Sequence, residues 1–175
     1  GNEEVATHCE GPCGPEEAAF GIGRHLFDRG CDFDFIDCGS LEAATTRDGL
    51  LEVADAAYRV LVFPAMHAVR MPMIEKARDF VRAGGLVIAF GCLPVASDGQ
   101  GRNDRRLMAM IDEIFGSTDS SGDGCRSHPG GGTGRFIRKD YAKVFDAIDS
   151  SVVRDVTTCV PLQVLRRRLG ERDVY

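Results

Sequence analysis

Two short apolar runs, separated by one amphipathic segment, dominate the hydrophobic pattern of the chain. Residues 59–63 and 86–90 are rich in β-branched and aromatic side chains, which is typical of strands buried on both faces of a parallel sheet. Between them, apolar residues recur at helical spacing until Gly84 and Gly85 end the pattern. The apolar positions of this helix are Met73, Ile74, Ala77, Phe80 and Val81. The pattern predicts a parallel crossover, the unit of a layered α/β fold.

Shorter elements are predicted on both sides of this unit. Further strands are expected at 3–8, 31–37, 50–53, 135–138 and 152–157. Further helices are expected from Pro15 to Gly30, from Asn103 to Gly116 and over 141–148. Ser40 and Asn103 are the expected caps of a short helical turn and of the second long helix, because both side chains accept hydrogen bonds from backbone amides.

Two stretches near the end of the chain differ from the rest. Residues 117–134 are mostly Ser, Gly and Asp, and this composition predicts a flexible surface loop. Residues 162–175 predict a hairpin that turns at 169–172 and leads towards a downstream domain missing from this chain. With 175 residues, we expect a single domain over 1–175.

Charge and cysteine content exclude some classes of function. A net charge of −6 and a pI near 5.2 argue against binding to nucleic acid or to an anionic membrane surface. No apolar run reaches the roughly 20 residues that a membrane helix needs. Seven cysteines without a repeating spacing favour reduced thiols and a cytoplasmic protein. No cofactor is predicted.

Several sequence blocks carry a resemblance to a known family. The blocks are YRVLVFPAM, ARDFVRAGG, VIAFGCLP and GIGRHLFDRGCDFDFID, together with VLRRRLGERDVY at the end. They resemble the glutamine-amidotransferase-like domain of bacterial glycoside hydrolases, as in the β-galactosidase trimerisation domain and in α-L-rhamnosidase-like proteins. The resemblance covers most of residues 15–116 and touches the last dozen.

This resemblance implies a fold and a role. The implied fold is flavodoxin-like, a three-layer α/β/α sandwich with a mainly parallel sheet, here with a C-terminal β-hairpin added. The implied role is that of a non-catalytic accessory or assembly domain of a multidomain carbohydrate-active protein. Self-association or contact with other domains of the parent chain would follow, with carbohydrate as a candidate ligand. The carboxylate pair that cleaves glycosides would then lie on a separate barrel.

A second hypothesis is a cysteine-dependent amidotransferase-like hydrolase. Cys92 follows the strand at 86–90, in register with the nucleophile of the resembled enzymes. Phe90 and Pro94, however, occupy the positions of the two glycines of that tight turn. The candidate base is His128, and Gly130 stands where the orienting glutamate is expected. The oxyanion turn is also altered, because the chain has Pro-Ala-Met at 64–66 instead of Pro-Gly-Gly.

A third hypothesis is a module that binds a small ligand or a sugar. In an open α/β sheet, ligands bind beyond the carboxyl ends of the strands where the strand order reverses. The residues expected there are Cys9, Gly11, Gly14, Pro64, His67 and Arg70. The glycine clusters at 21–23 and 130–134 lack the strand and helix context of a phosphate loop.

The start of the chain contains candidate zinc ligands. His8, Cys9 and Cys13 are close in sequence and have suitable ligand atoms. The fourth ligand would have to come from Cys38, His67 or Cys125, and no second regular pair of ligands exists. We therefore predict no metal site.

Overall fold

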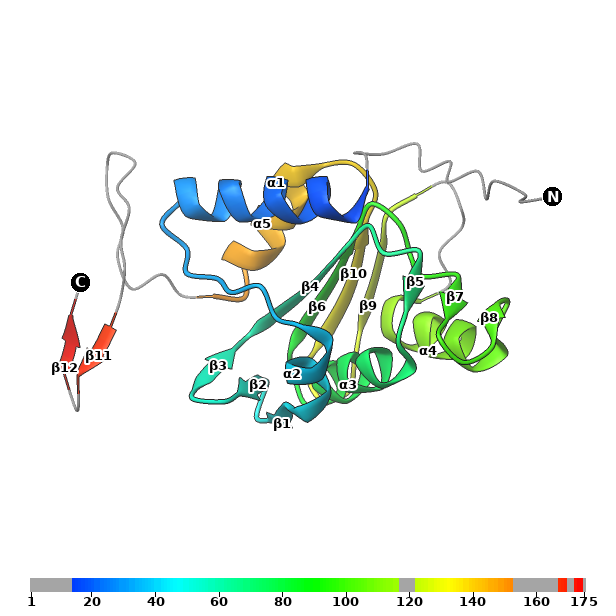
Figure 1. The fold of residues 1–175 in the computed structure, drawn as a ribbon. Coiled ribbons are helices and arrows are strands. Elements are labelled where there is room, and N and C mark those ends of the chain that lie inside the picture. The colour runs from blue at the N-terminus through cyan, green and yellow to red at the C-terminus, as the bar shows by residue number, and fades with distance from the viewer. Residues whose placement is uncertain (1–13, 117–121, 153–166, 170–171, 175) are drawn as a thin grey trace.

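A four-stranded sheet forms the centre of the molecule (Figure 1). The computed structural model describes residues 14–116 and 122–152, and the backbone of 167–169 and 172–174. The order of the sheet is β4-β6-β10-β9. Its strands are β4 (Val60–Pro64), β6 (Leu86–Phe90), β10 (Thr133–Ile137) and β9 (Gly124–Ser127). The first three strands are parallel, and β9 pairs with β10 in the antiparallel direction.

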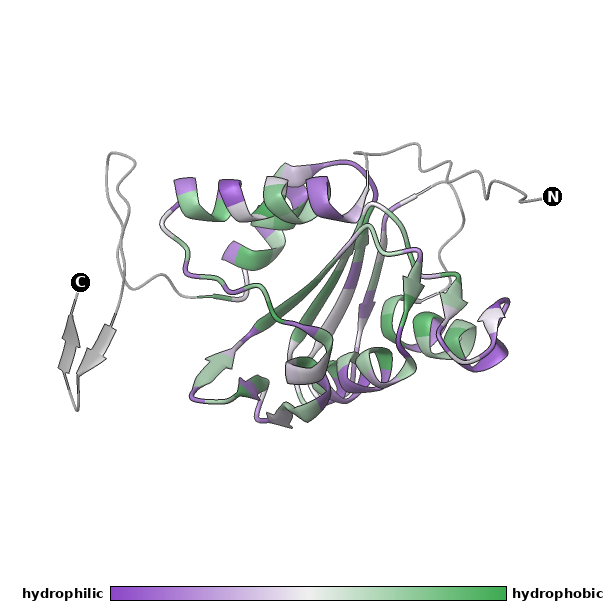
Figure 2. Ribbon diagram, viewed as in Figure 1, coloured by the Kyte–Doolittle hydropathy of each residue, from purple (hydrophilic) through white to green (hydrophobic). Residues whose placement is uncertain are grey.

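The central strand β6 is buried along its whole length, as its sequence predicts. Leu86 pairs with Val60 of β4 and with Thr133 of β10, and this register continues to Phe90. Figure 2 shows the apolar character of β4 and β6 against the more polar outer strand β9. The apolar runs at 59–63 and 86–90 are therefore confirmed as neighbouring parallel strands.

Helices cover both faces of this sheet (Figure 1). On one face, the core contains α2 (Cys38–Ala43), α3 (Met71–Arg82) and α4 (Arg105–Phe115). On the other face, it contains α1 (Pro15–Asp28) and α5 (Tyr141–Asp149). The predicted apolar face of α3 is confirmed, because Met73, Ile74, Ala77, Phe80 and Val81 are all buried.

Three small sheets complete the described structure. The first is β1 (Thr45–Arg47), β2 (Leu50–Val53) and β3 (Ala56–Tyr58), so the extra strand at 50–53 is confirmed. The second is β5 (Ala68–Val69), β7 (Ala96–Ser97) and β8 (Gly101–Arg102). The third is the predicted C-terminal hairpin, in which β11 (Arg167–Leu169) pairs with β12 (Arg172–Val174).

The prediction of a flexible loop over 117–134 is wrong for its second half. This stretch contains β9 and the start of β10, which pair in the antiparallel direction. Its glycines permit close packing: a Cβ on Gly134 would lie 1.9 Å from the carbonyl oxygen of Ile114, and one on Gly132 would lie 1.9 Å from that of Val81. The polar composition reflects an edge strand, and the glycines reflect close backbone contact with helices.

The strand predicted at 31–37 is also wrong. These residues form no strand ladder, although apolar and acidic side chains alternate along them. The segment and β4 line the same groove, and none of the described strands pairs with the segment. The pattern identified an extended backbone but could not identify its neighbour.

Neither of the two predicted helix caps, Ser40 and Asn103, is the observed one. Asp37 caps α2, since its carboxylate accepts a hydrogen bond of 3.0 Å from the backbone amide of Ser40, which lies inside the helix. Asp104 caps α4, while Asn103 precedes it with a left-handed φ of 61°. A carboxylate at the start of a helix also interacts favourably with the helix dipole.

The coarse fold is thus mixed α/β, built from one mixed sheet and three small ones. The strand predicted at 3–8 lies outside the described residues, as does nearly all of the one predicted at 152–157. Among the helices that the structure describes, none is long and apolar enough to cross a membrane. The cytoplasmic location expected from the cysteines remains a prediction.

Candidate functional site

The loops that follow β4 and β6 meet beyond the carboxyl ends of these strands. The amide of Ala65 donates to the carbonyl oxygen of Phe90 at 2.6 Å. The amides of Val95 and Ala96 both donate to the carbonyl oxygen of His67, at 2.9 and 3.2 Å. These bonds fix the two loops against each other, at the place where open α/β sheets bind ligands.

A cysteine and a histidine come together in this crevice. The Sγ of Cys92 lies 3.8 Å from Nδ1 of His67, and both side chains are partly buried. Sequence reasoning treated Cys92 as a nucleophile and His67 as a ligand residue, and it did not connect them. Each follows one of two neighbouring parallel strands, and the carboxyl ends of such strands share one edge of the sheet. This topological rule could have paired the two residues.

The predicted partner of Cys92 lies elsewhere. The Nε2 atom of His128 lies 3.1 Å from the carbonyl oxygen of Ile114, at the end of α4. Its backbone amide donates to Gly132 at 2.8 Å. His128 therefore contacts the turn between β9 and β10 and the end of a helix, and the structure brings His67 to Cys92 instead.

The backbone beside Cys92 is tightly constrained. Gly91 has a φ of 87°, and Ala65 has a φ of 39°, which is unusual for a residue with a side chain. A Cβ on Gly91 would lie 2.9 Å from the Cβ of Ala65. Left-handed backbone at non-glycine residues often occurs at functional sites. This strain marks the crevice as the site to test.

The hydrogen bonds of this backbone do not favour oxyanion binding. The amide of Ala65 is bonded to Phe90, and the amide of Gly91 donates to the carbonyl oxygen of Ile137 at 2.9 Å. An oxyanion hole needs amides that point at the reacting oxygen. The amides of Ala65 and Gly91 are thus directed at main-chain carbonyls.

The other residues that were predicted to bind a ligand lie at the ends of different elements. Gly14 precedes the first turn of α1 with a φ of 43°, and Pro64 ends β4. The guanidinium of Arg70 contacts Glu42 at 3.1 Å and Asp98 at 3.9 Å, so its charge is largely balanced. Cys9 and Gly11 lie outside the described residues.

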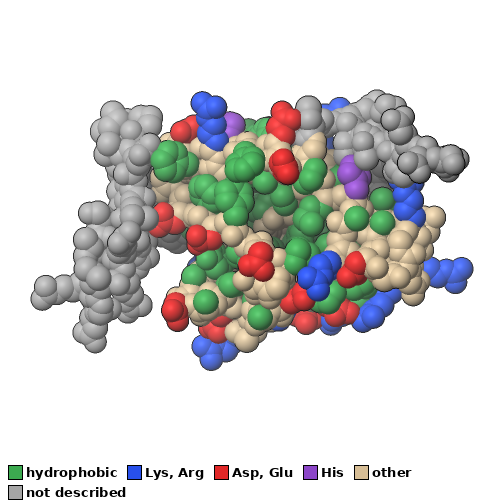
Figure 3. All heavy atoms as spheres, in the orientation of Figure 1, with side chains coloured by type: hydrophobic (Ala, Val, Ile, Leu, Met, Phe, Trp, Pro, Cys, Tyr) green, Lys and Arg blue, Asp and Glu red, His purple; other side chains and the backbone are tan. Residues whose placement is uncertain are grey.

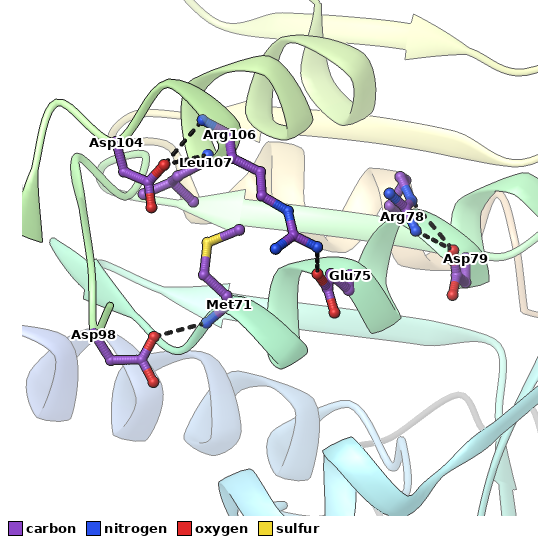
Figure 4. Close-up of polar contacts among 8 residues, drawn as sticks. All are labelled: Met71, Glu75, Arg78, Asp79, Asp98, Asp104, Arg106 and Leu107. Atoms are coloured by element: carbon purple, nitrogen blue, oxygen red, sulfur yellow. Dashed lines mark hydrogen bonds and ion pairs between the residues drawn. The ribbon is translucent and has the colours of Figure 1, made fainter. Parts of the chain in front are cut away.

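Many carboxylates of the described chain have structural contacts. The side chains of Asp104 and Asp140 accept hydrogen bonds from amides in the first turns of α4 and α5, at 2.9 Å each. Asp98 accepts a bond of 3.1 Å from the amide of Met71 at the start of α3 (Figure 4). The hydroxyl of Ser97 donates to Asp104 at 2.6 Å and is the main cause that lowers the pKa of this carboxyl. These acids stabilise helix ends.

Ion pairs engage further acids on the surface. Glu75 of α3 contacts Arg106 of α4, and Asp79 lies 3.0 Å from the neighbouring Arg78 (Figure 4). The hydroxyl of Tyr58 donates to Asp34 at 2.6 Å. Burial and this bond raise the pKa of Tyr58 to about 12, so the hydroxyl stays protonated at neutral pH. These acids are therefore also held by neighbouring side chains.

The candidate zinc ligands His8, Cys9 and Cys13 lie outside the described residues. Within the described ranges, no three His, Cys, Asp or Glu side chains are grouped closely enough to hold a metal ion. The pair formed by Cys92 and His67 offers two ligand atoms, whereas structural zinc sites use four.

The protein is an α/β domain, and its candidate functional residues lie beyond the carboxyl ends of the sheet strands. Residues 23–175 match the family model of glycoside hydrolase family 106, described as alpha-L-rhamnosidase. The chain belongs to this family. No curated protein matches it significantly by sequence.

Two solved structures have a similar fold. A beta-galactosidase from Rahnella sp. R3 aligns with a TM-score of 0.60 and 13% identity, over 86% of this chain and 29% of that one. Gan42B, a GH42 beta-galactosidase, aligns with a TM-score of 0.51 and 12% identity, over 73% of this chain and 25% of that one. The chain thus spans less than a third of the length of these structures. At such identities, the likeness concerns the fold alone.

Proposed function

We propose that the chain is a non-catalytic accessory domain of a larger glycoside hydrolase. The observation that supports this most is its span: the family match covers 23–175, while the chain aligns with only 29% and 25% of the two galactosidases. Most of an enzyme of that size lies outside such a domain. The description of the family makes an α-L-rhamnoside the proposed substrate of the parent protein.

The contacts of the acidic residues agree with this proposal. Glycoside cleavage needs two carboxyl groups that flank the bond, one of which must donate a proton. The carboxylates of Asp98, Asp104 and Asp140 accept hydrogen bonds from helix amides, and that of Asp34 accepts one from Tyr58. We infer that the catalytic pair lies on another part of the parent protein.

We also propose that the domain is related to the glutamine-amidotransferase-like group and has a flavodoxin-like core. Three parallel strands with helices on both faces support this relationship. A further support is the position of Cys92, two residues after the central strand β6. The mixed sheet and its antiparallel β9 leave the finer classification as a proposal.

The proposed role in assembly has a candidate surface beside α1. The side chains of Phe20 and Phe35 are 66% and 64% exposed, and their ring centroids are 5.7 Å apart. Phe33 contacts Phe35 edge to face at 5.5 Å. Clusters of exposed aromatic rings are typical of contact surfaces. A neighbouring domain of the parent chain or a second copy would cover them, and carbohydrate is the alternative ligand.

A second candidate function is that of a cysteine-dependent hydrolase. The distance of 3.8 Å between Cys92 Sγ and His67 Nδ1 favours it, because an adjacent histidine can activate a thiol. The hydrogen bonds of the Ala65 and Gly91 amides argue against it. A module that binds a small ligand at this crevice is the third candidate. The contacts of Arg70 with Glu42 and Asp98 make it a weaker anion site than the sequence suggested.

The reactivity of Cys92 distinguishes the first two functions. Iodoacetamide labelling of the Cys92 peptide would be followed by mass spectrometry between pH 6 and pH 8. For an accessory domain we expect a rate that rises more than about tenfold over this range, because only the thiolate reacts. His67→Ala should leave this rise unchanged.

The control is His128→Ala, which removes the other candidate base without touching the crevice. A rate that is nearly independent of pH, and that falls in His67→Ala but not in His128→Ala, would contradict the accessory role. It would instead identify a thiolate activated by His67.

A further inference from the structure

The outer face of α1 carries a regular pattern of charged and aromatic side chains. Glu16, Phe20 and Arg24 are all exposed and lie four residues apart, so they form one ridge along the helix. Ile22, which belongs to the buried face, is shifted by two residues from Phe20, or about 200° around the helix axis. This α1 ridge therefore points away from the sheet, with an acid before the aromatic ring and a base after it.

Aromatic rings of the segment 31–37 lie beside the α1 ridge. The ring centroids of Phe20 and Phe35 are 5.7 Å apart, and both side chains are mostly exposed. A Cβ on Gly23 would lie 3.1 Å from the ring of Phe33 and 3.2 Å from that of Phe35, so the segment packs where the helix has no side chain. In Figure 3, hydrophobic side chains gather over α1 and this segment, and charged side chains of both signs lie beside them. The helix and the segment thus present one continuous surface.

The two charged ends of the α1 ridge are accessible to a partner. None of the ion pairs among the described residues includes Glu16 or Arg24. The chain carries a net charge of −6, which opposes the association of two copies in general. Contact between copies therefore needs a place where opposite charges meet. The α1 ridge offers both signs within about 12 Å along the helix.

We propose that two copies of this chain associate through their α1 ridges, antiparallel to each other, about a twofold axis beside Phe20. Four residues span about 6 Å of a helix, so this arrangement places Glu16 of each copy opposite Arg24 of the other. The two Phe20 rings lie against each other, with Phe35 beside them. A parallel arrangement would bring like charges together instead. The contact is isologous and therefore closed, so two copies saturate it.

The order of residues on the α1 ridge favours a second copy over other partners. An acid, an aromatic ring and a base at equal spacing are complementary to the same series in reverse. Ridges of residues four apart also pack against each other in the commonest class of helix crossings, and aromatic and arginine side chains are enriched in protein contacts. A carbohydrate would use the rings but would leave the two charges at this spacing unexplained. This dimer rests on the assembly role proposed above and is independent of the absence of catalysis.

Charge reversal tests this pairing on the full chain. In sedimentation equilibrium, the mass of the wild type should rise from 19.0 kDa towards twice this value as the protein concentration increases. Glu16→Arg and Arg24→Glu each place like charges opposite each other twice, and each should weaken association at least about tenfold. An equimolar mixture of these two variants should associate within about threefold of the wild-type affinity, because every charge then meets its opposite. Arg102→Glu, at an exposed residue of β8, is the matched control and should associate like the wild type.

Three results would overturn the dimer. The first is a wild-type chain that stays monomeric at concentrations up to about 1 mM. The second is a dimer that survives both charge reversals and Phe20→Asp, because another surface would then hold it together. The third is a mixture of the two charge-reversed variants, each folded by circular dichroism, that associates no better than either variant alone. All three leave the non-catalytic role in place, since that role is tested separately by hydrolysis.

Discussion

Replacing Phe80 by alanine is expected to lower the free energy of unfolding by about 3–5 kcal/mol. Phe80 is 0% exposed and belongs to the core between α3 and the sheet. Its ring also covers the turn that leads into β6, since a Cβ on Gly85 would lie 2.2 Å from it. The backbone amide of Gly85 donates to the carbonyl oxygen of Phe80 at 3.0 Å, so the cavity would border a rigid turn that cannot collapse into it.

Urea unfolding followed by circular dichroism measures this loss. Phe27→Ala is the matched control, because Phe27 is 49% exposed and should cost less than about 1 kcal/mol. Equal losses for Phe80→Ala and Phe27→Ala would contradict the placement of Phe80 in the core.

Gly134→Ala is expected to destabilise the domain by about 3 kcal/mol, although it adds a single methyl group. The new Cβ would lie 1.9 Å from the carbonyl oxygen of Ile114 and 2.7 Å from its carbon. Both atoms belong to the backbone of α4, so a side-chain rotation cannot relieve the clash. Either the helix or β10 would have to move, and β10 is held on both sides by β6 and β9.

Gly99→Ala provides the comparison for this substitution. A Cβ on Gly99 meets nothing within 4 Å, and its φ is not in the left-handed region. Its free energy of unfolding in urea should stay within about 0.5 kcal/mol of that of the wild type. If Gly134→Ala were as mild, β10 could not lie as close to α4 as described.

The sequence predicted the parts of the fold that local patterns determine. The strands at β4 and β6 and the helix between them follow from continuous apolar runs and from a 3.6-residue period, and both signals lie within one segment. Strand β9 was missed because an edge strand buries little, so its Ser, Gly and Cys residues look like a loop. The glycines at 130–134 indicate flexibility when only the sequence is considered, although Gly134 of β10 allows close contact with α4.

The candidate site was only half predictable for a related reason. Cys92 could be identified from its position after a buried strand, and His67 from its place in the loop after the neighbouring strand. Their contact depends on the pairing of β4 with β6, which is a property of the whole sheet. His128 was chosen for its place in the sequence, and the hairpin of β9 and β10 directs it to α4 instead.

We propose that this domain does not itself cleave glycosides, and a hydrolysis rate tests this proposal. The purified chain would be incubated with p-nitrophenyl α-L-rhamnopyranoside, and the release of nitrophenol would be compared with that in buffer. Amide exchange at Leu61 and Phe63 would confirm that the protein is folded. We expect no rate above that in buffer, in the wild type and in Cys92→Ser alike. A rate proportional to protein concentration, and abolished by Cys92→Ser or Asp34→Asn, would contradict it.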